Sequence, residues 1–415
     1  MKSFLLFLLL GISGISSAQN LMDLSGSWAL ALDSLDVGEK ERWYQQPFSD
    51  SISLPGTTDL AGKGIPNRLV PKLEKPQLLR LTRENSYVGA AWYNREIDVP
   101  KSMAGQPLEL SLERVMWQSR LWVDGEEVLG AQESLIAPHR YLIQKGLSAG
   151  KHRITLRIDN RKRYDISAGN LAHAYTNDTQ IMWNGVLGKM NLSVKQEVSI
   201  RGVNVYPDVA NKKVRVVIAV ENSGDKPKKA KIALQVDEPE GRQQYKKKAI
   251  SVTLKEGVQK LEYDYSLDEG IKKWDEFTPY LYRLSVSCQS GRKKTAQKEV
   301  SFGMREMDNS QGILTVNGNR IFLRGTLECC IFPLTGTPPM TEEGWMKVFS
   351  TAKEWGLNHL RFHSWCPPEA AFSVADKLGF YLQVELPVWS YTMGKDEAMT
   401  RFLYGEFDRI VEAYG

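Results

Sequence analysis

The chain has 415 residues, of which 42% are apolar and 25% are charged, with a formal net charge of +5. These proportions are ordinary for a globular protein, and the length suggests about three domains. The basic stretches near Lys226 and Lys246 lie among strand-like runs, as lysines on solvated hairpin edges do. A nucleic-acid surface is therefore not expected.

The N-terminus has the pattern of a secretory signal peptide. Lys2 precedes an apolar run, FLLFLLLGI, and the small residues Ser16-Ser17-Ala18 follow it. This order predicts a signal peptide over residues 1–18, cleaved before Gln19. The apolar run is too short to span a membrane in the mature protein. We expect a periplasmic or secreted protein with no membrane span.

Two all-β regions follow in the sequence. Residues 19–198 contain short runs with period-two alternation, and Asp124-Gly125 separates two of them, as in antiparallel hairpins. The length and number of these runs predict a double-sheet jelly roll. Residues 199–302 contain a further set of strand-like runs over about a hundred residues, which predicts an immunoglobulin-like β-sandwich.

Residues 303–415 change to alternating strand and helix patterns. An apolar run at 321–323 ends in Arg324-Gly325, and a helix is expected over 341–355, with Thr341 at its start and Gly356 at its end. Strand, helix and strand follow over 356–363, 367–379 and 380–386. The alternation predicts the first three parallel βα units of a TIM (β/α)8 barrel. Because three units cannot close a barrel, we expect exposed strand edges and exposed apolar helix faces, and a segment after Arg320 that is protease-sensitive or drives aggregation.

Four polar side chains lie where these strands end, at the edge of a barrel that carries active sites: Glu328, Arg361, His363 and Glu385. Glu328 and Glu385 could act as acid and nucleophile on a glycosidic bond if they lie about 5 Å apart. Alternatively, each orients a neighbour or the hydroxyl groups of a substrate. Arg361 and His363 share one side of their strand. For Arg361, a structural salt bridge to Glu328 or Glu385 and a substrate contact both remain open.

Aromatic residues and cysteines complete the candidate set. Trp365 and Trp389 follow the second and third strands, where they could stack on sugar rings or pack the rim. The four cysteines are spaced neither as a disulfide framework nor as zinc ligands, so buried free thiols are expected. No phosphate-binding glycine loop, HExxH motif or G-x-S-x-G elbow occurs. We expect no cofactor and no metal.

Pieces of the sequence, in the same order along the chain, resemble glycoside hydrolase family 2, the group of β-galactosidases, β-glucuronidases and β-mannosidases. They include LSGSWALALD, YVGAAWYNREIDVP, NDTQIMWNGVLGKMNL, WDEFTPYLYRL and GLNHLRFHSWCPPEAAFSVADKLGFYLQVELPVW. The resemblance implies an exported, retaining, exo-acting O-glycosyl hydrolase whose partner is an oligosaccharide or a polysaccharide-derived glycan. It implies a substrate-binding set, from the strand ends and from a jelly-roll loop: Glu328, Arg361, His363, Glu385, Trp389, Asp178, Gln180, Trp183 and Asn184.

The sequence also departs from the family pattern. Glu328 stands near the place where members often carry Asn and His, and His363 lies one position earlier than the family histidine. The family acid/base glutamate follows an Asn in an Asn-Glu pair, and no such pair follows Leu386. The resemblance therefore implies that both catalytic carboxylates lie beyond Gly415 and that this chain alone is inactive. The alternative function is a non-catalytic carbohydrate-binding protein that acts through the jelly roll.

Overall fold

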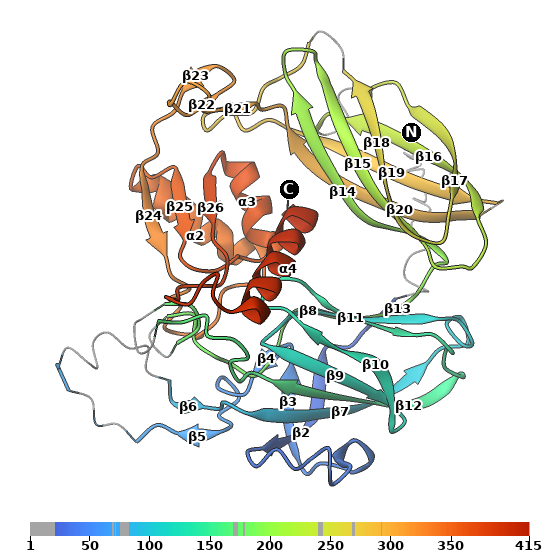
Figure 1. Cartoon of the computed structure of the whole chain (residues 1–415), viewed down its shortest axis with the longest axis vertical. Coiled ribbons are helices and arrows are strands. Elements are labelled where there is room, and N and C mark those ends of the chain that lie inside the picture. Colours follow the sequence, from blue (N-terminus) through green and yellow to red (C-terminus); the bar gives the residue numbers. More distant parts are fainter. Residues whose placement is uncertain are drawn as a thin grey trace, which may run out of the picture.

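The structure is a computed structural model, and it describes residues 21–68, 70, 72–74, 83–168, 173–176, 179–239, 244–267, 270–291 and 293–414. The expected signal peptide, residues 1–18, lies outside the described residues. Within them, no helix is long and apolar enough to cross a membrane. The chain forms two β domains followed by a short parallel sheet with three helices (Figure 1).

The first domain consists of two antiparallel sheets. One sheet has the strand order β1 (Leu21–Asp23), β13 (Gly185–Val194), β8 (Leu108–Val115) and β11 (His139–Ile143), with β4 (Gly56–Thr57) paired to β13. The other has the order β10 (Glu126–Glu133), β9 (Gln118–Val123), β12 (Gly150–Asp159), β7 (Ala90–Val99), β2 (Gly26–Asp33) and β3 (Asp50–Leu54). A separate pair, β5 (Ile65–Pro66) and β6 (Asn85–Ser86), and the short helix η2 (Trp43–Gln45) lie outside these sheets. Alternate side chains meet between the sheets in one core, which includes Trp28, Leu110 and Leu156.

The second domain is a sandwich of a three-stranded and a four-stranded sheet. The first sheet is β14 (Val198–Asp208), β15 (Lys213–Asn222) and β18 (Gly257–Ser266). The second is β17 (Lys248–Leu254), β16 (Lys228–Asp237), β19 (Leu281–Ser290) and β20 (Lys293–Gly303). Their facing side chains form a second core, in which the Cys288 thiol is buried and forms no disulfide. The prediction of two successive β domains is confirmed.

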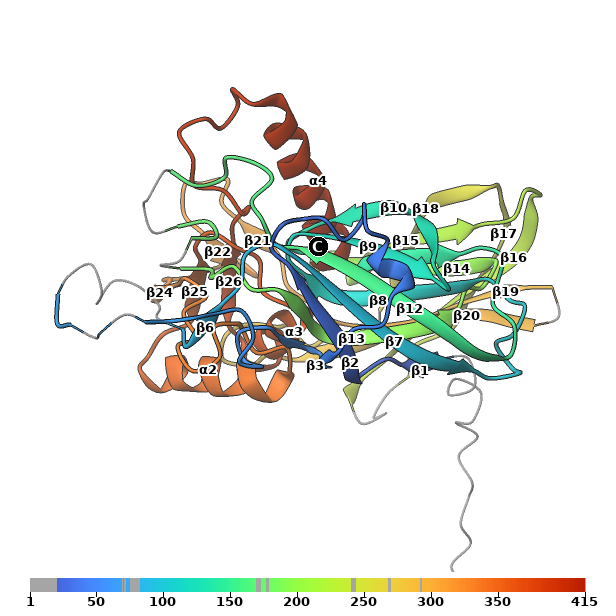
Figure 2. The same cartoon turned by 90° about the horizontal axis from the view of Figure 1, so that it is seen from below.

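The last region begins with a small antiparallel sheet and continues as parallel βα units. The small sheet is β21 (Met307–Asp308), β22 (Thr315–Val316) and β23 (Asn319–Arg320). The parallel sheet is β24 (Gly325–Glu328), β25 (His359–Phe362) and β26 (Tyr381–Val384), with helices α2 (Glu342–Glu354), α3 (Glu369–Leu378) and α4 (Glu397–Tyr414). In Figure 2, α2 and α4 lie on opposite sides of the parallel strands. Closure of these three strands into a barrel stays a prediction.

The helix boundaries follow local signals in the sequence. The Thr341 hydroxyl accepts the amide of Gly344 at 3.3 Å and caps α2, and Glu342 and Glu343 occupy its first turn, where the helix dipole favours negative charge. Gly379 ends α3 with a φ of 69°, a backbone conformation that other residues adopt at a cost. The two helices expected at 341–355 and 367–379 are confirmed.

The first parallel strand lies later than the sequence predicts. The apolar run at 321–323 was expected to form the strand, but β24 is Gly325–Glu328. The side chain of Asn358 donates to the carbonyl of Phe322 at 3.0 Å and accepts the amide of Arg324 at 2.7 Å, and its backbone amide donates to the carbonyl of Arg324 at 2.9 Å. These bonds attach residues 322–324 to the residue that precedes β25.

Helix α4 joins the parallel region to the jelly roll. Met399, Phe402 and Leu403 pack in one cluster with Trp117, Tyr175 and other jelly-roll residues. The side chain of Phe407, on another face of α4, is 52% exposed, and so is that of Leu327 on the edge strand β24. The expected exposure of apolar side chains is therefore confirmed on β24 and on one face of α4, and it is wrong for the face of α4 that the jelly roll covers.

Candidate functional site

The carboxyl ends of the parallel strands face the jelly roll, as Figure 1 shows. Gln180, from the loop that precedes β13, joins the two parts. Its Nε2 donates to the carbonyl of Cys329 at 2.9 Å and to the carbonyl of His363 at 2.7 Å, and its Oε1 accepts the amide of Ala174 at 2.8 Å. Because Cys329 and His363 follow β24 and β25, this one side chain fixes the spacing of two strand ends.

Glu385 is the centre of a cluster at these strand ends. Its Oε1 accepts the Nε of Arg361, and its Oε2 lies 2.7 Å from Nδ1 of His363 and 2.9 Å from Oγ of Ser364. Burial acts to raise the pKa of Glu385, but the bonds from His363, Arg361 and Ser364 outweigh burial, and the pKa is lowered. Glu385 is therefore an ionised carboxylate that orients an arginine and a histidine.

Glu328 has a different environment from Glu385. Its Oε2 accepts the amide of Cys330 at 3.1 Å, and no basic side chain pairs with it among the described residues. Burial raises its pKa from the ordinary value to about 7, although the bonds from Cys330 and Ile331 act in the opposite direction. The two carboxyl groups at this edge thus hold their protons very differently at neutral pH.

A pair of histidines and a tryptophan lie beside this cluster. The ring of His173, from the jelly roll, lies 4.5 Å from the ring of His363 and 5.1 Å from that of Trp389, in edge-to-face arrangements. The amide of Trp389 donates to the carbonyl of Ile166 at 2.8 Å, which ties this loop to the jelly roll. An aromatic wall from both parts of the chain therefore borders the charged cluster, as in many sites that bind sugars.

Family sequence profiles match the two β domains. The profile of the glycosyl hydrolases family 2 sugar-binding domain matches residues 21–186, and the profile named glycosyl hydrolases family 2 matches residues 198–305. The chain belongs to glycosyl hydrolase family 2. The resemblance stated from the sequence is confirmed.

Curated relatives in the family match most of this chain but are much longer. A β-glucuronidase of Paenibacillus borealis is 20% identical over 389 residues, which cover 90% of this chain and 60% of that protein. A β-galactosidase of Pseudoalteromonas haloplanktis is 24% identical over 386 residues, which cover 89% of this chain and 36% of that protein. The chain thus spans between about a third and three fifths of the length of these relatives.

Solved structures in the family share the fold of this chain. The β-glucuronidase of Ruminococcus gnavus in complex with D-glucuronic acid has a TM-score of 0.72 and 16% identity, covering 95% of this chain and 64% of that one. A family member from Bacteroides cellulosilyticus has a TM-score of 0.73 and 16% identity, covering 95% and 51%. At 16% identity, the likeness shows the fold of this chain and does not identify its ligand.

The structure brings together most of the residues expected at the strand ends of this family 2 chain. Arg361, His363 and Glu385 are in contact, and Trp389 lies beside them through His173. Arg361 forms the salt bridge to Glu385, one of the two roles left open by the sequence. Trp365 is 2% exposed, and its Nε1 donates to the carbonyl of Glu328, so it packs the rim.

The jelly-roll residues of the expected set lie elsewhere. Gln180 is 2% exposed and its amide is used between the domains. Asn184 is fully buried and bonds to Tyr93, Gly89 and Ile158 inside the jelly roll, and Trp183 is 4% exposed in the cluster that α4 covers. These positions do not support the expected substrate contacts, because the polar groups of Gln180 and Asn184 already have partners and the ring of Trp183 is buried. Asp178 lies outside the described residues.

Sequence reasoning missed His173, Ser364 and Cys329. Ser364 follows the predicted His363, and Cys329 follows Glu328, so their proximity to the strand ends was a usable signal. The Cys329 thiol is partly exposed, and burial together with Glu328 and Glu385 raises its pKa. His173 lies in a loop of another domain, and the sequence carries no signal that brings it to His363.

Proposed function

We propose that this chain provides the sugar-binding framework of an exported, retaining, exo-acting glycosidase of family 2. The observation that carries the proposal is the Glu385 cluster, in which one carboxylate orients Arg361, His363 and Ser364 beside the aromatic wall of His173 and Trp389. Charged donors beside aromatic edges suit a ligand with many hydroxyl groups. In this proposal, β24, β25 and β26 are the first three strands of the catalytic barrel.

The proposal assigns binding, and not bond cleavage, to these strand ends. Both oxygens of Glu385 accept hydrogen bonds, so the carboxylate is held for orientation rather than presented for attack on a sugar carbon. The opposite pKa shifts of Glu328 and Glu385 favour the alternative in which these two groups are acid and nucleophile. Activity measurements separate the two assignments.

We expect the purified chain to bind one of a series of p-nitrophenyl β-glycosides and to hydrolyse none. The series contains the galactoside, glucoside, mannoside and glucuronide, and binding is measured by titration calorimetry, with released nitrophenol as the activity signal. Glu385→Gln should weaken binding about tenfold, because it removes the charge that orients Arg361 and His363. Glu299→Gln, an exposed change on β20 of the sandwich, is the matched control and should have no effect. Turnover that is lost in Glu328→Gln or Glu385→Gln would instead assign the chemistry to this pair.

Export is part of the same proposal. It rests on Lys2, the apolar run that follows and the small residues that end at Ala18. The protein purified from the periplasm or from the medium should begin at Gln19 when its N-terminal peptide is analysed by mass spectrometry. An exported protein that retains Met1 would contradict the cleavage site.

The jelly roll gives little support to the alternative of a binding protein that acts through that domain alone. Stacking on sugars needs an exposed ring face. Trp28, Trp92 and Trp117 are almost completely buried, and Trp122 is covered by the stacked ring of Tyr44. These tryptophans therefore contribute to cores and not to a sugar-binding surface.

A further inference from the structure

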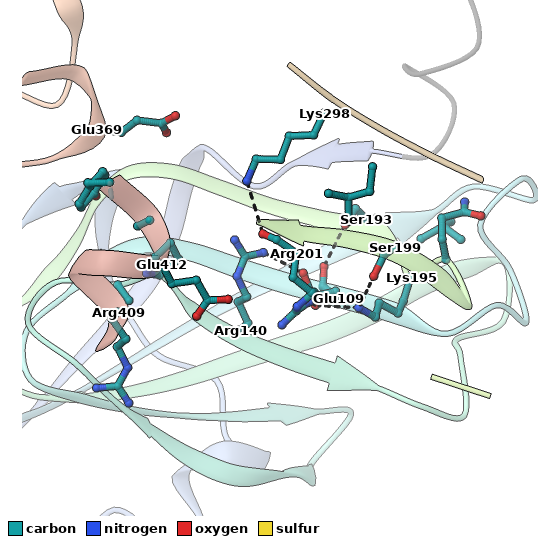
Figure 3. A pocket seen from close by; sticks show the side chains of 17 residues that line it. Glu109, Arg140, Ser193, Lys195, Ser199, Arg201, Lys298, Glu369, Arg409 and Glu412 are labelled. Atoms are coloured by element: carbon teal, nitrogen blue, oxygen red, sulfur yellow. Dashed lines mark hydrogen bonds and ion pairs between the residues drawn. The ribbon is translucent and has the colours of Figure 1, made fainter. Parts of the chain in front are cut away.

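A cavity of about 580 Å³ lies where the jelly roll, the sandwich and the helices meet (Figure 3). Its walls come from β8, β11 and β13 of the first domain, from β14 and β20 of the second, and from α3 and α4. The volume is typical of cavities that hold small ligands. Neither Glu328 nor Glu385 lines it, so it is separate from the site described above.

One side of the cavity contains a set of charges that pair with one another. One carboxylate oxygen of Glu109 accepts a hydrogen bond from Arg140 at 2.9 Å, and the other accepts one from Arg201 at 3.0 Å. Burial acts to raise the pKa of Glu109, but Arg140, Arg201 and Lys195 outweigh it and the pKa is lowered. Lys195 pairs in turn with Glu221. With three basic groups and two carboxylates, this side offers polar groups with one positive charge in excess to a ligand.

Three other charged residues line the cavity and form no ion pair with one another: Lys298, Glu369 and Glu412. Lys298 is partly buried, and its ammonium group donates to the carbonyl of Arg201 at 3.4 Å. Within the described part of the chain, the carboxylates of Glu369 and Glu412 have no ion-pair or hydrogen-bond partner, and no carboxylate lies within 4.0 Å of the Lys298 ammonium; the backbone carbonyl of Glu412 accepts Asn204 at 3.5 Å. Figure 3 shows Lys298 on the sandwich side and the two glutamates on the side of the helices.

We propose that this cavity is a second carbohydrate site, which binds a neutral pyranose between Lys298 and the carboxylates of Glu369 and Glu412. A hydroxyl group both donates and accepts, so neighbouring hydroxyls of one sugar ring satisfy an ammonium and a carboxylate at the same time. Tyr414 also lines the cavity; one face of its ring stacks on Phe372 with 4.1 Å between the ring centroids, which leaves the rest of the ring to contact the C–H groups of the sugar.

Charged ligands fit this lining less well. An anion would meet Glu369 and Glu412 at the mouth, while Arg140 and Arg201 already have Glu109 as their counterion. A cation would meet Lys298 and the other basic groups of the wall. A neutral ligand with many hydroxyl groups avoids both repulsions and completes the hydrogen bonding of the three unpaired charges. The proposal goes beyond the function proposed for the strand ends and does not depend on it.

The test is titration calorimetry of the purified chain with the methyl β-pyranosides of glucose, galactose and mannose. The protein carries Glu385→Gln, so that the strand-end site contributes little. We expect saturable binding of at least one of these neutral sugars. Lys298→Met should weaken it about tenfold or more, because a hydrogen bond to a charged group is lost. Glu412→Gln should weaken it several-fold, and Lys231→Met, an exposed change on β16 of the same sandwich, should leave it unchanged.

Several results would overturn the proposal. They are the absence of saturable binding of all three sugars, binding that persists in Lys298→Met and Glu412→Gln, and preferential binding of sodium glucuronate or glucosamine hydrochloride. Thermal unfolding of each variant is measured beforehand. If Lys298→Met does not fold, the surface changes Glu412→Gln and Glu369→Gln decide the outcome. The chain with native Glu385 is titrated as well. If it binds the sugar and the single change Glu385→Gln abolishes this binding, the sugar is assigned to the strand ends, which would also overturn the proposal.

Discussion

Between pH 5 and pH 8, the chain should lose up to about 3 kcal/mol of stability through Glu328, and the Glu328→Gln variant should not show this loss. The pKa of Glu328 is raised by burial to about 7 in the folded chain. At pH values between the ordinary pKa of a glutamate and 7, the carboxyl group of Glu328 keeps its proton in the folded state and loses it in the unfolded state. Stability due to this group is therefore fully present at low pH and falls as the pH rises through 7. The measurement is urea unfolding at a series of pH values.

The comparison with Glu328→Gln isolates this one group from the histidines of the same region. Burial lowers the pKa of His173 and of His359, and such groups act in the opposite sense, because their stability contribution increases as the pH rises. These histidines are the same in both proteins, so they cancel in the difference. Glu299→Gln, exposed on β20, should keep the pH dependence of the unchanged chain. Parallel curves for the chain and Glu328→Gln would mean that Glu328 is ionised in the fold, as in an exposed site.

The parts of the fold that were predicted well from the sequence are those that local sequence patterns mark. Thr341 and Gly356 mark the ends of α2, and period-two alternation marks the strands of both β domains, because these patterns depend on residues close in sequence. The start of the first parallel strand was predicted too early, at 321–323, whereas its end at Glu328 was right; Asn358, more than thirty residues away, bonds to residues 322 and 324. No local pattern at 321–328 contains this information.

The residues of the candidate site also fall into two groups, those that local patterns predict and those that contacts between distant parts of the chain place. Glu328, Arg361, His363 and Glu385 were predicted because parallel strands place their carboxyl ends at one edge. His173 and the role of Gln180 depend on how the jelly roll docks on that edge, which is a contact between residues about 150 or more positions apart in sequence. Gln180 was expected to contact substrate, and it instead bonds to two backbone carbonyls, because docking buries it.

Glu406→Ala should destabilise the docking of α4 on the jelly roll by about 3 kcal/mol. The side chain of Glu406 is completely buried and accepts the hydroxyl of Ser134 at 2.8 Å, the amide of Leu135 at 3.0 Å and the guanidinium of Arg409 at 2.5 Å. Truncation leaves the buried groups of Ser134 and Leu135 without an acceptor. The loss appears in urea unfolding and in faster tryptic cleavage after Arg409.

Glu397→Ala is the matched control on the same helix. Its carboxylate is 92% exposed and lies 3.6 Å from Arg401, so its removal should change little. The comparison also tests the earlier expectation that everything after Arg320 is open to protease, since α4 packs Phe402 and Leu403 into a cluster shared with the jelly roll. If Glu406→Ala were as stable as Glu397→Ala and cleaved no faster than it, α4 would not be held on the jelly roll in solution. The covered face of α4, which carries Glu406, would then be as accessible to protease as the exposed face, which carries Phe407.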